Sequence, residues 1–275
     1  MNKPEKFALI IGSMKSGTTY LYDLMVQHPE LLGCLEKEPS FFSNAGGLES
    51  NWEKGMSYYD SLWPNWDSTK YKYALEASVN YSKVDTFPNA AERIETVTDR
   101  NFKFIYIIRN PIERVRSHMS FMTTYWRRKG TTDEDISAHA LEISKYALQL
   151  DEYKSRFPEE NILILLFEDF IVNPQKTVNK IFEFLEIDSF EVELNAEKNS
   201  SSDQAFLPIV HKIRNLIPVS LSFRSLLPKF VMNLLKDKEL ENFKLTKEEE
   251  LGILEELKIL FKLFLLNGNI ENMYH

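Results

Sequence analysis

The chain has 275 residues, a formal net charge of −8 and 43% hydrophobic residues. This is enough apolar material for one substantial core, or for a core with a helical extension. The acidic balance argues against nucleic acid as the main partner, because binding to nucleic acid favours a basic surface. One cysteine excludes an intrachain disulfide framework, and the five scattered histidines show no metal-ligand spacing.

The sequence also lacks the usual signals for membranes and secretion. No stretch approaches the roughly 18 apolar residues that span a membrane. The apolar run before Gly12 is too short for the apolar region of a signal peptide. A cytoplasmic protein without a membrane span is therefore the simplest expectation.

The first predicted element is a strand at residues 7–11, followed by the loop Gly12-Ser-Met-Lys-Ser-Gly17-Thr-Thr19 and a helical pattern. A strand, a glycine-containing loop and a helix N-terminus bind anions through backbone N–H groups and the helix dipole. The two glycines have the spacing of the nucleotide-triphosphate loop G-x-x-x-x-G-K-[ST], but Thr18 stands where that motif has lysine. The lysine, Lys15, lies inside the loop. An ordinary strand-to-helix turn with two glycines is the alternative.

Strands and helices alternate from this loop onward. Further strands are expected at residues 31–35, 71–77, 102–108 and 162–167, and helices at residues 17–27, 52–64, 85–97, 111–128, 133–157 and 174–186. The run at 102–108 is nearly continuous in apolar, β-branched and aromatic residues, as is typical of a central parallel strand. The alternation predicts an α/β fold, a parallel sheet flanked by helices, over about residues 5–190.

A helical part is expected to follow at about residues 203–275, within the same single domain 1–275. Residues 206–235 are rich in leucine, isoleucine, phenylalanine and valine around three prolines. We expect helices packed on the core there; a lid over the substrate, a membrane-surface face and a partner-binding face are the alternatives. Thr246 and Glu249 form a capping box for the last helix.

Two predicted strand ends carry groups suited to an anionic ligand, and open parallel sheets bind ligands at such ends. The first end leads to Lys15, Ser16, Gly17, Thr18 and Thr19. The strand at 102–108 leads to Arg109, and Ser117 lies two helical turns beyond the Asn110 cap on about the same face. Arg109 and Ser117 can therefore converge on one anionic group, although each alone is also an ordinary polar position. His118 points about 100° away from Ser117 on a helix and is expected to play no part.

These motifs resemble the paired cofactor motifs of sulfotransferases that use 3′-phosphoadenylyl sulfate (PAPS). The resemblance implies a P-loop-like fold, in which residues 15–19 bind the 5′-phosphosulfate and Arg109 and Ser117 bind the 3′-phosphate. Three more stretches, in the same order, are similar to segments of the heparan-sulfate type enzymes: Lys37-Glu-Pro-Ser-Phe-Phe42, Glu76-Ala-Ser-Val-Asn-Tyr81 and Phe167-Glu-Asp-Phe-Ile-Val-Asn-Pro174. The match covers about residues 5–190.

The resemblance also implies roles for single residues. Lys15 stabilises the negative charge that develops on the bridging oxygen as the nucleotide leaves. Thr18, Thr19 and loop N–H groups hold the 5′-phosphate. Glu38 is the candidate general base, because the family places its catalytic glutamate in this segment; without the resemblance it is a surface carboxylate. Two acceptor-side positions depart from the family pattern: Ala77 replaces a lysine, and Ser40 replaces a histidine or glutamine.

The expected function is transfer of a sulfuryl group from PAPS to a hydroxyl or amine of a small or medium acceptor, such as a natural product or sugar. Adenosine 3′,5′-bisphosphate (PAP) is the other product. No metal ion is expected, because a sulfuryl group carries less charge than a terminal phosphoryl group, and Arg109 stands where a Walker-B aspartate is expected. A P-loop kinase or NTPase and a non-catalytic nucleotide-binding module are the alternatives.

Overall fold

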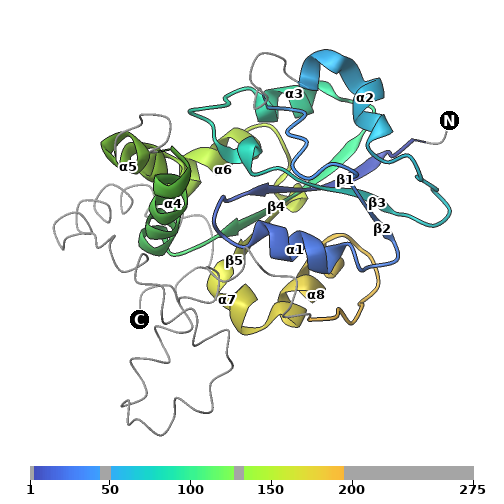
Figure 1. Cartoon of the computed structure of the whole chain (residues 1–275). Helices are drawn as coiled ribbons and strands as arrows, with labels where there is room; N and C mark the ends of the chain where they lie inside the picture. The colour runs from blue at the N-terminus through green and yellow to red at the C-terminus, as the bar shows by residue number, and fades with distance from the viewer. Residues whose placement is uncertain (1–2, 44–50, 127–132, 195–275) are drawn as a thin grey trace, which may run out of the picture.

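A five-stranded parallel sheet forms the centre of the computed structural model, which describes residues 3–43, 51–126 and 133–194 (Figure 1). The strand order is β2-β3-β1-β4-β5. The strands are β1 (Lys6–Gly12), β2 (Leu31–Gly33), β3 (Tyr73–Ala77), β4 (Asn101–Ile108) and β5 (Ile162–Leu166). Because β1 lies between β3 and β4 and pairs in parallel with both, the loop after β1 leaves the middle of the carboxyl edge. The predicted parallel sheet is confirmed.

Helices cover both faces of the sheet and its carboxyl end (Figure 1). One face carries α1 (Thr18–Met25), α7 (Phe167–Val172) and α8 (Pro174–Phe184), and the other carries α2 (Gly55–Ser61), α3 (Ala90–Thr96) and α6 (Tyr146–Lys154). Two further helices, α4 (Pro111–Trp126) and α5 (Asp133–Glu142), pack against each other beyond the end of β4. Short 3-10 helices are η1 (Asn51–Lys54), η2 (Val79–Ser82) and η4 (Glu159–Asn161). Among the residues described, no helix is both long and apolar enough to cross a membrane.

Alternation along the strands divides the apolar residues into two cores, since successive side chains of a strand point to opposite faces. Phe7 and Leu9 of β1 pack with the aromatic residues of α2 and α6. Ala8 and Ile10 pack with α1, α7 and α8 on the other face. Apart from Lys6, Asn101 and Lys103 toward the strand starts, β1 and β4 are therefore apolar on both faces, which explains why their nearly continuous runs were visible in the sequence.

The structure corrects several expected boundaries. The helix expected at 85–97 begins at Ala90, because Pro88 disfavours helical backbone in the residue before it. The single helix expected at 133–157 is two helices, α5 and α6. Between them the buried Ser144 side chain donates to Ala140 O at 2.7 Å and accepts from Arg114 Nε at 2.8 Å. The helical part expected at 203–275 lies outside the described residues.

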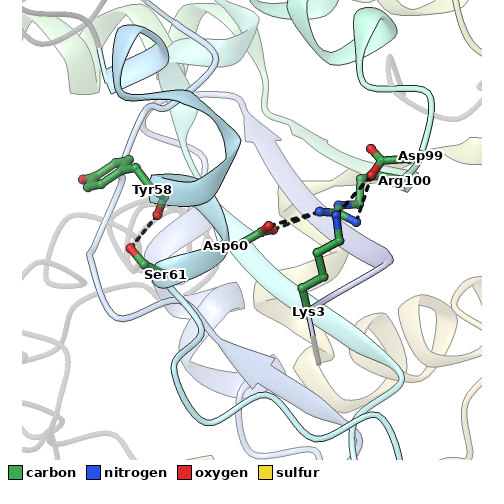
Figure 2. A network of polar contacts seen from close by, with 6 residues as sticks. All are labelled: Lys3, Tyr58, Asp60, Ser61, Asp99 and Arg100. Carbon is green, nitrogen blue, oxygen red and sulfur yellow. Dashed lines mark hydrogen bonds and ion pairs between the residues drawn. The ribbon is translucent and has the colours of Figure 1, made fainter. Parts of the chain in front are cut away.

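A polar network joins α2 to the start of β4 (Figure 2). The Arg100 side chain, which is 2% exposed, donates from Nη2 to both carboxylate oxygens of Asp60 at 3.2 and 3.1 Å. Its Nη1 lies 3.3 Å from Asp99, which also pairs with Lys3. The Asp60 side chain is 21% exposed and that of Asp99 is 64% exposed, so Asp60 is the partner that is shielded from water.

We expect Asp60→Ala to lower the free energy of unfolding by about 2 kcal/mol, because it leaves the buried guanidinium with one exposed partner. The matched control, Asp99→Ala, removes only the exposed ion pairs with Arg100 and Lys3 and should cost less than about 1 kcal/mol. Urea denaturation of the full chain at neutral pH measures both losses. Equal losses of unfolding free energy in the two variants would show that burial of the Asp60–Arg100 pair adds nothing to stability.

Candidate functional site

The loop after β1 is anchored to the neighbouring strand. The backbone N–H and Oγ of Ser13 both donate to Ile107 O, each at 2.9 Å. Ser13 Oγ also lies 2.7 Å from Ser16 Oγ, and the Ser16 N–H donates to Ser13 O at 3.2 Å. Ser16 is fully buried. Its side chain therefore shapes the loop from within.

Gly17 ends the loop and caps α1. Its φ of +78° lies in the left-handed region, and a Cβ there would lie 3.1 Å from the Phe167 ring. The backbone conformation thus favours glycine, and a side chain would be tight against the Phe167 ring. No side chain caps α1, so the N–H groups of its first turn, which includes Thr18 and Thr19, face outward as donors for an anion.

Lys15 combines backbone strain with a partly desolvated charge. Its φ is +71°, a conformation that residues other than glycine rarely adopt. The ammonium lies 4.3 Å from the centroid of the Phe121 ring. Burial, together with the positive charge of Arg109, lowers the pKa of Lys15 to about 8. A cation in this state gains more from a bound anion than a solvated lysine does.

Arg109 joins the end of β4 to the loop after β1. Its Nη1 donates to Lys15 O at 3.1 Å, and its guanidinium lies 4.7 Å from the centroid of the Phe167 ring. The side chain is buried, and Nε has no hydrogen-bond partner among the described residues. Burial lowers the pKa of Arg109, while Glu113 and Glu168 act in the opposite direction. The two strand ends predicted to carry the site are therefore adjacent.

The start of α4 fixes the backbone around Arg109. Asn110 Oδ1 accepts from the N–H groups of Ile112 at 3.1 Å and Glu113 at 3.3 Å, which confirms the predicted cap. The Asn110 N–H donates to Glu168 Oε1 at 2.8 Å. Glu168 belongs to a stretch singled out in the sequence, but this contact was not expected. Ser117 lies further along α4 and is half-buried; its convergence with Arg109 on one anion stays a prediction.

The loop that carries Glu38 has an unusual backbone. Glu38 has a φ of +51° and Ser40 a φ of +49°, and two left-handed residues so close together are costly without support. Support comes from residues after β3: the Ser40 N–H donates to Ser78 Oγ at 3.0 Å, and the Phe42 N–H donates to Tyr81 Oη at 3.3 Å. Two motifs about 40 residues apart in sequence thus lie side by side.

Glu76 is the buried acceptor behind this support. Its side chain is fully buried and accepts from Ser78 Oγ at 2.7 Å and from Tyr59 Oη at 2.6 Å. Burial raises the pKa of Glu76, and the hydrogen bonds from Tyr59, Tyr81 and Ser78 oppose that rise. Glu76 is therefore a positioning residue, which acts on the Glu38 loop through Ser78.

The surroundings of Glu38 include a lysine that the sequence did not indicate. Burial raises the pKa of Glu38, and the charges of Lys83 and Lys37 oppose this. Lys83 Nζ donates to Asn80 Oδ1 at 2.7 Å, and Asn80 Nδ2 donates to Ser40 Oγ at 3.2 Å. Burial lowers the pKa of Lys83 to about 8, while the charge of Glu38 raises it. Lys83 lies near Glu38 because the short helix η2 follows β3 and turns the chain back toward the Glu38 loop. The family motifs do not include Lys83, so comparison of motifs could not identify it.

Ser78→Ala tests the support of the Glu38 loop. Loss of Ser78 Oγ leaves the buried Ser40 N–H without a partner and removes one of the hydrogen bonds to the Glu76 carboxylate, so we expect a loss of about 1–3 kcal/mol in stability. Amide exchange at Ser40 should accelerate at least tenfold, while the Thr69 amide, held by Asp67 at 2.9 Å, should not change. Hydrogen exchange followed by mass spectrometry measures both. Unchanged exchange at Ser40 would contradict the positioning role.

The fold and the loop define the class of the protein: a P-loop-like α/β protein with an anion-binding loop after the central strand and a basic residue at the end of the neighbouring strand. The sulfotransferase domain family matches residues 5–206. Because this match covers most of the chain, the protein belongs to the sulfotransferase family.

The chain is similar to several known members. It is 27% identical over 192 residues to heparan sulfate glucosamine 3-O-sulfotransferase 6 of Homo sapiens, covering 65% of this chain and 51% of that protein. It is 26% identical over 197 residues to bifunctional heparan sulfate N-deacetylase/N-sulfotransferase 1 of Mus musculus, covering 66% and 22%. The chain thus spans about half the length, or less, of these curated relatives. The crystal structure of a sulfotransferase from Alicyclobacillus acidocaldarius shares the fold with a TM-score of 0.57 and 24% identity, over 81% of this chain and 98% of that one.

Proposed function

We propose that this protein transfers a sulfuryl group from PAPS to a hydroxyl or amine of a small or medium acceptor, such as a natural product or sugar. One observation carries the proposal: half-buried Lys15 and buried Arg109 place two cations at adjacent strand ends, and Arg109 Nη1 donates to the Lys15 carbonyl oxygen at 3.1 Å. Two such cations favour a ligand with more than one anionic group.

The residues fit PAPS in their donor chemistry. Arg109 Nε lacks a partner among the described residues, and the first turn of α1 has no side-chain cap. Buried donors are normally hydrogen-bonded, so Arg109 Nε and the N–H groups of the first turn of α1 are available to an anionic ligand. The proposed contacts to the 5′-phosphosulfate come from Lys15, Ser16, Gly17, Thr18 and Thr19. The 3′-phosphate is assigned to Arg109 and Ser117.

PAPS supplies an activated sulfuryl group when bound, and the chain supplies charge and proton transfer around it. Lys15 donates to the oxygen on which negative charge develops as the sulfur–oxygen bond to the nucleotide breaks. Glu38 accepts the proton of the acceptor hydroxyl or amine as the new bond to sulfur forms. The products are the sulfated acceptor and PAP, and Glu38 returns its proton to solvent.

The chain differs from its heparan sulfate relatives on the side of the proposed site that would bind the acceptor. The relatives named above are heparan sulfate enzymes, whereas this chain has Ala77 and Ser40 at two acceptor-side positions and a net charge of −8. An acidic protein attracts a long polyanion weakly. These features support an acceptor that is not a long polyanion. Phosphoryl transfer is not favoured, because Thr18 occupies the position of the Walker lysine.

The proposal is tested by incubating the full chain with PAPS and an acceptor library, with product detection by mass spectrometry. We expect a sulfated product in equal amounts with and without EDTA. Lys15→Ala should lower kcat about 100-fold, which corresponds to roughly 3 kcal/mol of transition-state stabilisation, by analogy with loss of one oxyanion donor. The exposed Lys70→Ala is the control. Mg²⁺-dependent ATP turnover without a sulfated product would favour a kinase or NTPase, and PAP binding without any product would favour a non-catalytic module.

The pH dependence of kcat/KM tests the roles of Glu38 and Lys15 in the free enzyme. Burial raises the pKa of Glu38, so its carboxylate form, and with it activity, should disappear at a higher pH than for a free glutamate. Activity should also fall above pH about 8, as Lys15 loses its proton. Glu38→Gln should remove the acidic limb and lower kcat at least about 100-fold. The exposed Glu36→Gln is the matched control. Full kcat in Glu38→Gln would show that the base is another residue.

A further inference from the structure

Four basic side chains beyond Glu38 have no role in the mechanism above. Arg114 and His118 lie on α4, His139 lies on the adjacent α5, and Lys83 follows η2. We call these four residues the basic group. They come from three segments that are separate in sequence, and α4 and α5 lie side by side (Figure 1).

Two members of the basic group bury polar atoms without partners. Arg114 is fully buried; its Nε donates to Ser144 Oγ at 2.8 Å and its Nη2 donates to Ala140 O, but its Nη1 has no partner among the described residues. His118 is also fully buried, and neither ring nitrogen has a hydrogen-bond partner in the described part of the chain. Its ring centroid lies 5.4 Å from that of His139. These three buried nitrogens on one face of α4 are available to hydrogen-bond with a ligand.

The charges around these nitrogens favour an anion. Burial, and then the positive charge of Arg114, lowers the pKa of His118 to about 2. Burial, and then the positive charge of Lys83, lowers the pKa of His139. Both imidazoles are therefore neutral at neutral pH and can donate or accept hydrogen bonds. Arg114 keeps its charge, and Lys83 is mostly protonated. The main neighbouring charges acting on both histidines are cations.

The basic group also lies within electrostatic range of the reacting groups. Lys15 Nζ lies 4.3 Å from the centroid of the Phe121 ring, which is about one helical turn beyond His118 on α4, and the charge of Lys15 acts on His118. Lys83 is linked through Asn80 to Ser40 of the Glu38 loop, and the charge of Glu38 acts on Lys83. The group is thus close both to the lysine assigned to sulfuryl transfer and to the carboxylate assigned to proton transfer. An acceptor that reaches Glu38 comes within range of Lys83.

We propose that Lys83, Arg114, His118 and His139 bind an anionic substituent of the acceptor, a carboxylate or a phosphate or sulfate ester. Lys83 and Arg114 supply the charge, and the two imidazoles supply neutral hydrogen bonds. The substituent lies beside the hydroxyl or amine that Glu38 deprotonates. This rests on the proposed function, because it specifies the acceptor of the same site.

Inorganic phosphate is the probe for a binding test on the full chain saturated with PAP. Calorimetric titration at pH 7 and constant ionic strength should show saturable binding that weakens at least tenfold in Lys83→Met. His139→Gln, at a half-buried position, should weaken it as well. Lys70→Met should leave it unchanged, and PAP affinity should be the same in all variants, which verifies folding. Absence of saturable binding, or equal affinity in wild type and Lys83→Met (an adventitious ion only), would overturn the proposal.

Turnover of matched acceptors separates this subsite from the reaction itself. The pairs are glucosamine 6-phosphate with glucosamine, and 4-hydroxybenzoate with 4-hydroxybenzamide. We expect kcat/KM to favour the anionic member at least tenfold in the wild type, and the ratio to approach one in Lys83→Met. Sulfation without a preference for the anion would overturn the subsite and leave the proposed function standing. Phosphate binding that depends on Lys83, with no sulfated product from any acceptor, would support the subsite and overturn the proposed function.

Discussion

The hydrogen bond from the Arg109 guanidinium to the Lys15 carbonyl oxygen organises this protein. It places two cations at neighbouring strand ends, although like charges repel. The repulsion is tolerated because the contact runs through the Lys15 backbone and not through its ammonium. Parallel pairing of β1 with β4, and the two bonds from Ser13 to Ile107, hold the strand ends in place. The sheet therefore fixes a concentration of positive charge that an anionic ligand stabilises.

The acceptor side depends on a different kind of constraint. Here a buried hydrogen-bond network supports the strained backbone: Glu76 and Ser78 hold two left-handed residues of the Glu38 loop. The loop presents its carboxylate next to Lys83 without a direct bond between them; the link passes through Asn80 and Ser40. The two halves of the proposed site thus rest on separate strands, β1 and β4 for the Lys15 and Arg109 side and β3 for the support of the Glu38 loop.

Features of the fold that depend on local sequence could be predicted. The apolar runs of β1 and β4, the Asn110-Pro111 start of α4 and the loop between β1 and α1 were all found where the sequence indicated. The break between α5 and α6 could not be predicted, because it depends on the contact of Ser144 with Arg114, 30 residues away. Lys83 was missed for a similar reason. Its position near Glu38 depends on how η2 folds after β3. Comparison with the family motif considers only position 77, where the family has a lysine and this chain has Ala77.

His118 shows the limit of helical-wheel reasoning. A rotation of about 100° correctly separates it from Ser117 on α4, but the face to which it turns is covered by α5 and not by solvent. Which face of a helix is buried depends on what packs against it, and this is a tertiary property.

The lowered pKa of Lys15 has a consequence for the chemistry of the unliganded protein. An amine with a pKa near 8 is unprotonated in about one molecule in ten at pH 7, whereas an ordinary lysine is almost entirely protonated. A neutral amine is a nucleophile, so Lys15 and Lys83 are the lysines of the described residues most open to acylation or Schiff-base formation by small electrophiles. A bound anion stabilises the ammonium form and suppresses this reactivity. Amine-directed covalent reagents therefore distinguish the empty site from the occupied one.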